Sequence, residues 1–191
     1  MTGPAIGAAR PFVLIRHGQT DANRDGLIAG RIEARLTGEG RAAAARLADW
    51  PWPGSLALYV SPQDRARHTA RLAFPGLAFR VLPGLRERDW GRYEGHPVAT
   101  LPPREATPEG GESFAALLAR VAASITEGLA ASGEALPVFV AHSGVIRAAR
   151  ALTGGTAHGP SAANTTPLLF RPCPAGWQNS QLSRKDLAWT V

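Results

Sequence analysis

The sequence predicts an α/β fold, namely a three-layer α/β/α sandwich around a mostly parallel central sheet. Short apolar runs rich in β-branched residues alternate along the chain with longer stretches of helical periodicity. Two of these runs end directly in a histidine, at His17 and at His142. Because ligands bind beyond the carboxyl ends of parallel strands, both histidines are expected at the functional end of the sheet.

Six segments are predicted to be strands. The first four cover 12–15, 56–60, 79–82 and 137–141. Three of them are continuous apolar runs of the kind that a sheet buried on both faces needs, whereas Arg80 makes 79–82 a weaker strand signal. The segments 166–170 and 187–191 are expected at the sheet edges. Pro167 cannot donate a ladder hydrogen bond in the first of them, and the given chain ends in the second.

Helices are predicted between these strands. Thr37 is the expected N-cap of an alanine-rich helix that reaches Leu47, and a second helix covers 64–74 before Pro75. The clearest helix covers 113–131, where apolar side chains recur at helical spacing behind the cap Ser113. A fourth helix covers 144–152. The Pro- and Gly-rich segment 97–111 is expected to be a surface loop over one end of the sheet.

Length and composition predict one ordinary globular domain over 1–191, with a flexible segment at 1–10. The chain has 191 residues, of which 45% are hydrophobic and 19% are charged. Cys173 is the single cysteine, which excludes an intramolecular disulfide and a thiolate metal cluster. Arg10 and Pro11 interrupt the apolar N-terminal stretch, and no uninterrupted apolar run approaches the ~20 residues of a membrane helix. The expectation is a soluble cytoplasmic protein with no membrane partner.

The formal charge of +6 does not by itself indicate nucleic-acid binding. The arginines are spread along the whole chain, and Lys185 is the only lysine. Scattered arginine suits a small anionic partner, whereas a nucleic-acid surface needs clustered cations. The expected partner is therefore a small anionic substrate and not a nucleic acid.

Four motifs at the ends of predicted strands carry the residues suited to chemistry. They are Arg16-His17-Gly18 with Thr20 and Asn23, the segment 61–69 with Arg65, the segment 85–95 with Glu87, and His142-Ser143-Gly144. Neutral imidazole is a good nucleophile, arginine forks match phosphate oxygens, and a carboxylic acid can protonate a leaving oxygen. These are the groups that phosphoryl transfer without a metal requires.

In this order, the four motifs resemble those of the histidine phosphatase superfamily, which includes cofactor-dependent phosphoglycerate mutases and many small phosphatases. The resemblance extends from Phe12 to about Arg150. It implies that His17 is the nucleophile and Glu87 the general acid. It also implies that Arg16, Arg65 and His142 stabilise the transferring group, that Thr20 and Asn23 contact the phosphate, and that Ser143 and Gly144 adjoin the substrate. The family uses no metal, and no cofactor is expected for this chain.

Two assignments have competitors within the same motifs. Arg67 competes with Arg65, although the motif favours Arg65 and leaves Arg67 on the helix surface. Asp89 competes with Glu87 for the acid role, while Glu94 belongs to the turn that follows. The other histidines, at 68, 96 and 158, show no metal-ligand spacing.

The sequence departs from the family pattern around the predicted site. Ser143 stands where glycine is common, Glu33 where aspartate is usual, Ala22 where tryptophan is usual, and Ala43 where glutamine is frequent. These departures put the substrate preference in question more than the chemistry.

The resemblance implies a phosphomonoesterase that acts through a phosphohistidine on a small phosphorylated metabolite. The stretch Gly110-Gly111-Glu112-Ser113 makes α-ribazole phosphate one candidate substrate, and a homodimer is one candidate assembly. A phosphoglycerate mutase is the close alternative, but only the short segment 94–111 occupies the place of the large mutase insertion. A catalytically silent phosphate-binding module is the alternative from another class.

Overall fold

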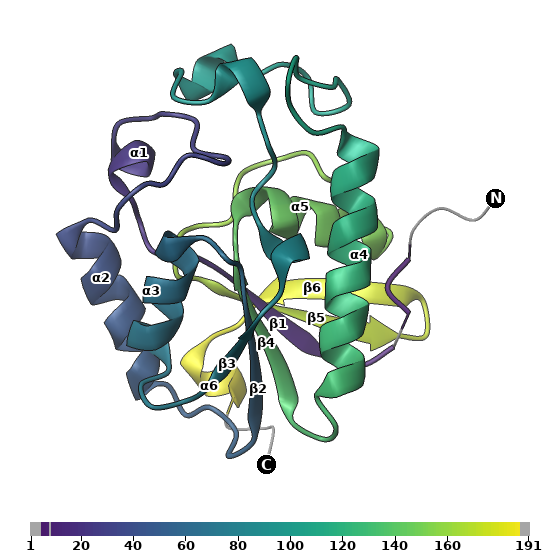
Figure 1. Cartoon of the computed structure of the whole chain (residues 1–191). Coiled ribbons are helices and arrows are strands. Elements are labelled where there is room, and N and C mark those ends of the chain that lie inside the picture. The colour runs from purple at the N-terminus through teal and green to yellow at the C-terminus, as the bar shows by residue number, and fades with distance from the viewer. Residues whose placement is uncertain (1–4, 8, 188–191) are drawn as a thin grey trace.

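The computed structural model describes residues 5–7 and 9–187, and these form a central sheet covered by helices (Figure 1). Within them, six strands lie in the order β3-β2-β4-β1-β5-β6. The neighbouring strands from β3 to β1 are parallel to one another. Strand β5 is antiparallel to both of its neighbours, β1 and β6. The strands are β1 (Phe12–Arg16), β2 (Leu56–Val60), β3 (Phe79–Val81), β4 (Leu136–Ala141), β5 (Pro167–Cys173) and β6 (Gly176–Gln181). The predicted α/β fold with a mostly parallel sheet is confirmed.

The helices follow the predicted alternation, with short additions. The α-helices are α1 (Asp21–Arg24), α2 (Gly38–Ala45), α3 (Asp64–Ala73), α4 (Phe114–Ala131), α5 (Ser143–Leu152) and α6 (Arg184–Leu187). The 3₁₀ helices are η1 (Arg46–Asp49), η2 (Pro83–Leu85), η3 (Gly91–Tyr93) and η4 (Val98–Thr100). Thr37 and Ser113 cap α2 and α4 as predicted, each accepting a hydrogen bond from a backbone N–H of the first turn.

Two apolar clusters, one on each face of the sheet, make the fold three-layered. Alternate residues of β1 enter different clusters, because successive side chains of a strand point to opposite faces. Phe12 and Leu14 pack with apolar residues of α4 and α5, whereas Val13 and Ile15 pack with those of η1 and α3. Figure 1 correspondingly shows α2 and α3 across the sheet from α4. Burial on both faces is the reason for the continuous apolar runs.

Helix α4 supplies much of the first cluster through one apolar stripe. Leu117, Val121, Ile125 and Leu129 are buried against the sheet. Among the described residues it is also the one helix long and apolar enough to cross a membrane, by length and composition only. The buried stripe is what a core helix of this kind requires.

The end of the chain departs from the sequence prediction in two places. The predicted strand at 166–170 is β5, but it lies inside the sheet between β1 and β6 and not at an edge. Pro167 is tolerated there because it is the first residue of the strand. Of the strand predicted at 187–191, Leu187 ends helix α6, and residues 188–191 lie outside the described residues.

The true edge strand, β6, was not predicted from the sequence. Five of its six residues are exposed and residues 178–181 are all polar, so its sequence carries no apolar alternation.

Part of the N-terminal segment predicted to be flexible lies against α4. Residues 1–4 and 8 of this segment are outside the described residues. Ile6 packs against the first apolar cluster, and the Gly7 N–H donates to Thr126 Oγ1 at 2.9 Å. The Arg10 guanidinium donates to the carbonyl of Ala135 at 2.8 Å, beyond the end of α4.

Candidate active site

The two predicted histidines meet at the carboxyl ends of adjacent parallel strands. Arg16 of β1 pairs in register with Ala141 of β4, and the His17 N–H donates to the Ala141 carbonyl at 2.9 Å. The next side chains are therefore neighbours, and the rings of His17 and His142 lie 5.1 Å apart between centroids. The topology brings together residues that are far apart in the sequence.

Hydrogen bonding assigns the protonation of the His17 ring. Its Nδ1 lies 2.8 Å from the Gly18 carbonyl oxygen, which can only accept, so Nδ1 carries the hydrogen and donates. The lone pair is then on Nε2. Burial lowers the pKa of His17 well below its usual value, and the charges of Arg65 and Arg16 lower it further. The ring is therefore neutral at neutral pH, as a nucleophile must be.

His142 is buried beside Arg65 and Ser61. The Arg65 Nε–H donates to His142 Nδ1 at 3.4 Å, and His142 Nε2 lies 2.7 Å from Ser61 Oγ. With Nδ1 accepting, Nε2 carries the hydrogen and donates to Ser61. The pKa of His142 is also lowered well below its usual value, first by burial and then by the charge of Arg65. Both imidazoles are thus held neutral in a cationic environment.

Arg65 and Arg67 occupy different environments on α3. The Arg65 side chain is 1% exposed and the Arg67 side chain 39% exposed. Arg65 donates to the carbonyls of Ala29, Gly30 and Ile32 at 2.8–3.0 Å. Arg67 forms an ion pair with Asp64 at 3.7 Å instead. Arg65, the residue that the motif favours, is therefore the one beside His142.

Arg16 enters the site from the end of β1. Its Nη1 donates to the Ala162 carbonyl at 2.9 Å, while its buried Nε has no hydrogen-bond partner in the described part of the chain. Burial lowers the pKa of Arg16, and the negative charge of Glu87 opposes that shift. A buried N–H without a partner costs about 1–3 kcal/mol, which an incoming oxyanion would offset.

Six of the predicted residues line one cavity of about 250 Å³ at this end of the sheet: Arg16, His17, Asn23, Glu87, Ser143 and Gly144. His142 and Arg65 lie buried behind it, in contact with each other. Thr20 does not line it. Thr20 is fully buried, and its hydroxyl accepts from the Asn23 N–H to cap α1. The structure thus brings together all the predicted residues except Thr20, which acts on Asn23 instead.

Of the two carboxylates that compete for the acid role, Glu87 lines the cavity and Asp89 does not. Glu87 Oε2 accepts from the Gly144 N–H at 3.0 Å, in the first turn of α5, and Glu87 lines the cavity. Asp89 accepts from the Gly91 N–H at 2.9 Å and pairs with Arg31 at 3.3 Å, and it is not among the described residues that line this cavity. Of the two carboxylates, only Glu87 borders the space beside His17.

Several residues of the site were not found by sequence reasoning. Asn164 donates through Nδ2 to the His17 carbonyl at 2.7 Å and to Asn23 Oδ1 at 3.2 Å. Gln63 accepts from the Glu87 N–H at 2.8 Å and so helps to place that carboxylate. Arg104 and Arg147 line the cavity. Arg147 could have been predicted, because it lies one helical turn after Ser143 and on the same face of α5. Arg104 could not, because it lies in an irregular loop whose sequence has no periodic pattern.

The departures from the family pattern have distinct structural settings. Ser143 lines the cavity, whereas Ala22 is buried in α1. The Glu33 carboxylate lies 3.9 Å from Arg65 Nη1, on the side away from His142. Only Ser143 among these three borders the space open to a substrate.

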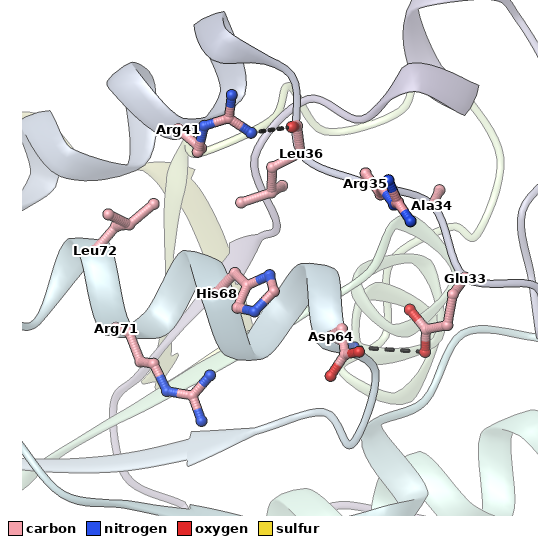
Figure 2. Close-up of a pocket in the computed structure, with 9 residues that line it drawn as sticks. All are labelled: Glu33, Ala34, Arg35, Leu36, Arg41, Asp64, His68, Arg71 and Leu72. Carbon is pink, nitrogen blue, oxygen red and sulfur yellow. Dashed lines mark hydrogen bonds between the residues drawn. The ribbon is translucent and has the colours of Figure 1, made fainter.

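A larger cavity, of about 690 Å³, lies between the start of α2 and α3, and it contains none of the predicted site residues. Figure 2 shows Arg41 donating to the Leu36 carbonyl, at 2.6 Å, and Glu33 accepting from the Asp64 N–H. His68, a histidine expected to have no catalytic part, lines this cavity. Size alone does not mark the site, because the convergent polar groups lie at the smaller cavity. No cluster of three or more potential metal ligands occurs in the part of the chain that the structure describes.

The sequence profile of the histidine phosphatase superfamily (branch 1) matches residues 12–165, which include both histidines and every residue of the predicted site. The chain belongs to the histidine phosphatase superfamily. The matched region ends before β5, β6 and α6, so the superfamily assignment rests on the strands and loops that build the site.

Individual members of the histidine phosphatase superfamily are similar over most of the chain. The adenosylcobalamin/α-ribazole phosphatase of Salmonella typhimurium is 32% identical over 70% of this chain and 74% of its own length. The glucosyl-3-phosphoglycerate phosphatase of Mycobacterium tuberculosis is 32% identical over 73% of each. The crystal structure of the α-ribazole phosphatase from Shigella flexneri superposes with a TM-score of 0.78 at 26% identity, covering 91% of this chain and 96% of that one. Proteins named as phosphatases thus share both sequence and fold with this chain, and it is a phosphatase.

Proposed function

We propose that the protein hydrolyses small phosphomonoesters through a phosphohistidine on His17, without a metal ion or another cofactor, in the cytoplasm. The observation that carries the proposal is the state of the His17 ring. Because Nδ1 donates to the Gly18 carbonyl and the ring is held neutral, the Nε2 lone pair is the one available for attack.

The first step transfers the phosphoryl group to the enzyme. His17 Nε2 attacks phosphorus, the ester P–O bond breaks with its electron pair on the leaving oxygen, and the Glu87 carboxylic acid supplies the proton. The phosphorylated ring keeps its Nδ1 hydrogen and gains positive charge. The Gly18 carbonyl, already in contact with Nδ1, stabilises that charge.

The second step hydrolyses the phosphohistidine. Water attacks phosphorus, the Glu87 carboxylate accepts its proton, and the P–N bond breaks with its electrons returning to His17. Arg16, Arg65 and His142 stabilise charge on the transferring group in both steps, and Asn23 and Ser143 adjoin its oxygens. The orphaned Arg16 Nε–H supports this role, because a phosphoryl oxygen would satisfy it.

The substrate candidates come from the relatives. α-Ribazole phosphate and glucosyl-3-phosphoglycerate appear in the names of similar phosphatases, and they are the first two substrates to test. A phosphoglycerate mutase is the alternative reaction, and its product is an isomer and not free phosphate.

The decisive experiment compares wild type with His17→Ala on p-nitrophenyl phosphate and on these metabolites, with chelator present throughout. We expect wild type to release inorganic phosphate and to form an acid-labile phosphoprotein. His17→Ala should form none and should lose turnover by on the order of 10³-fold or more, as nucleophile deletions do. His68→Ala, at an exposed histidine of α3, is the matched control and should behave as wild type.

The proposal fails if His17→Ala still forms the phosphoprotein or if chelator abolishes turnover of the wild type. Isomerisation of 3-phosphoglycerate without phosphate release would favour the mutase. A folded wild type with neither phosphoprotein nor turnover would favour the silent binding module.

A further inference from the structure

The proposed reaction makes no use of the stretch Gly110-Gly111-Glu112-Ser113, yet this stretch is bound to the segment that carries Glu87. The Glu112 N–H donates to the Asp89 carbonyl at 2.9 Å. The Arg88 Nε–H donates to the Glu112 carbonyl at 3.0 Å. The backbone of Glu112 is therefore fixed beside the motif of the predicted general acid.

The Glu112 carboxylate forms a bidentate ion pair with Arg120 of α4. Arg120 Nε donates to Glu112 Oε1 at 2.6 Å, and Nη2 donates to Oε2 at 2.7 Å. The Arg120 side chain is 13% exposed and the Glu112 side chain 9% exposed. Arg86 is a more distant partner of the same carboxylate, at 3.6 Å. A bidentate pair fixes the plane of the guanidinium as well as its position, so Glu112 determines where the remaining Arg120 donors point.

The remaining Arg120 donors hold the backbone that leads to Glu87. Nη1 donates to the carbonyls of Gly84 and Arg86 at 2.6 and 2.7 Å, and Nη2 donates to the Glu87 carbonyl at 3.1 Å. An arginine side chain has five N–H groups, and all of them are engaged here, two by Glu112 and three by backbone carbonyls. The guanidinium is thus a rigid link between one carboxylate and the segment 84–87.

The N–H of Glu87 is held as well, because it donates to Gln63 Oε1 at 2.8 Å. Glu87 lies in irregular backbone after η2, where neither a strand nor a helix fixes the main chain. Side-chain contacts to its N–H and its carbonyl therefore decide from where its carboxylate enters the cavity.

We propose that Glu112 and Arg120 are positioning residues for the Glu87 general acid. Glu112 orients the Arg120 fork, and Arg120 places the backbone from which the Glu87 carboxyl group reaches the leaving oxygen. Neither side chain is among the described residues that line the cavity, so both act through Glu87. The inference rests on the proposed phosphatase function and adds two residues to it. A proton donor must lie within hydrogen-bond distance of the oxygen that it protonates, so a small displacement lowers the rate.

The test compares wild type and Glu112→Gln on phenyl phosphate and on p-nitrophenyl phosphate. The two esters differ by one nitro group, which makes the leaving oxygen much less basic and less dependent on a proton from Glu87. The parameter kcat/KM reports the steps up to cleavage of the ester bond, where Glu87 acts as the acid. We expect kcat/KM to fall by about tenfold or more for phenyl phosphate and much less for p-nitrophenyl phosphate.

Arg120→Lys is the second variant, and it keeps a positive charge opposite Glu112. A lysine ammonium has three N–H groups and no planar fork, so it cannot hold Glu112 and three carbonyls at once. We expect the same selective loss for phenyl phosphate. Because the charge balance of the pair is kept, this variant tests the geometry of the link and not the loss of a charge.

Two control variants lie farther along the same helix. Glu127→Gln removes an ion pair between α4 and Arg80 of β3 and should leave both kcat/KM values as in wild type. Gly128→Ala controls for instability, because an added Cβ would lie 2.6 Å from the Phe139 ring. It should lower the melting temperature without changing the ratio of the two kcat/KM values. Circular dichroism checks the folding of every variant.

Three results would overturn the inference and leave the proposed function standing. One is an unchanged kcat/KM for phenyl phosphate in folded Glu112→Gln. Another is an equal loss on the two esters in the folded variants, which would show a general structural role. The third is failure of both variants to fold, which would show that the pair serves stability first. If folded wild type releases phosphate from neither ester, the proposed function itself fails, and this inference fails with it.

Discussion

The Glu87 carboxylate rests on the backbone of Gly144, in the first turn of α5. A Cβ at position 144 would overlap Glu87 Oε1, so this approach requires glycine. Helix N-termini favour negative charge, because their first N–H groups have no partner within the helix. The glycine after Ser143 thus has a steric purpose, in addition to its place in the motif.

Gly144→Ala should therefore impair the acid step through Glu87. We expect kcat for an alkyl phosphate to fall by about 10²-fold, within the range that general acids contribute. p-Nitrophenyl phosphate should lose much less, because its leaving group needs little protonation. Steady-state kinetics on both substrates checks this, with Gly54→Ala, whose Cβ would meet open space, as the control. Equal losses on the two substrates would count against the acid role of Glu87.

Most residues of the candidate site were predictable from the sequence. His17, Arg16, Glu87 and Ser143 lie in short motifs that follow predicted strands, so the sequence predicts that they share the carboxyl end of the sheet. Asn164 was not predictable in this way, because it reaches His17 from 147 positions away. Thr20 was assigned to the phosphate, but its hydroxyl is engaged by the Asn23 N–H.

At the scale of elements, α4 packs tightly against the sheet at Gly128. Gly128 faces Phe139 of β4, and a Cβ there would lie 2.6 Å from the ring and 3.2 Å from Tyr59. Glycine costs a helix interior about 1 kcal/mol relative to alanine. The close packing of α4 on β4 is what this residue makes possible.

Gly128→Ala should destabilise the protein in spite of its better helix propensity. Overpacking a tight core costs about 1–3 kcal/mol, so we expect a net loss in the free energy of unfolding measured with urea. Gly38→Ala, in the first turn of α2 and facing open space, should be neutral or stabilising. A stabilised Gly128→Ala would mean that α4 can move away from the sheet at little cost.

The predicted elements match the observed ones where burial is two-sided. The runs that became β1, β2 and β4 are continuous and apolar, and the α4 stripe has helical spacing. β6 escaped prediction because an exposed edge strand needs no apolar pattern. The edge position expected for β5 was wrong for the same reason, because β6, which pairs with its outer side, has no apolar pattern in its sequence.

At the scale of the whole molecule, much of the arginine excess is structural. Arg65, Arg88 and Arg147 all donate to carbonyls of irregular segments at the carboxyl end of the sheet. Arg120 of α4 likewise donates to the carbonyls of Gly84, Arg86 and Glu87. Loops over a sheet carry backbone acceptors that need partners, and arginine forks supply them. The charge therefore serves the loops as well as an anionic substrate.

The buried neutral histidines should make the stability of the whole molecule depend on pH. The folded pKa values of His17 and His142 are lowered, first by burial. Above pH ~6.5, both folded and unfolded states are neutral at these rings. Below it, the unfolded chain binds protons that the folded state does not, so the free energy of unfolding should fall by up to about 2.7 kcal/mol per pH unit for the pair.

Urea unfolding between about pH 8 and pH 5, in phosphate-free buffer, measures this slope. The double variant His17→Ala/His142→Ala should show a shallower slope than wild type. His68→Ala should keep the wild-type slope, because that side chain is exposed to water in the folded state. An unchanged slope in the double variant would show that these rings do not account for the loss of stability in acid.

The sequence alone determined the alternation of strands and helices from β1 to β5, the two-sided burial of the sheet and the end of the sheet at which the candidate site lies. These properties depend on residues close together in the chain, and periodicity and motifs record them. The tertiary structure alone decided which arginines border the cavity, which nitrogen of His17 carries the hydrogen and where β6 lies. Those outcomes depend on contacts between segments far apart in the chain, and local sequence patterns leave such contacts open.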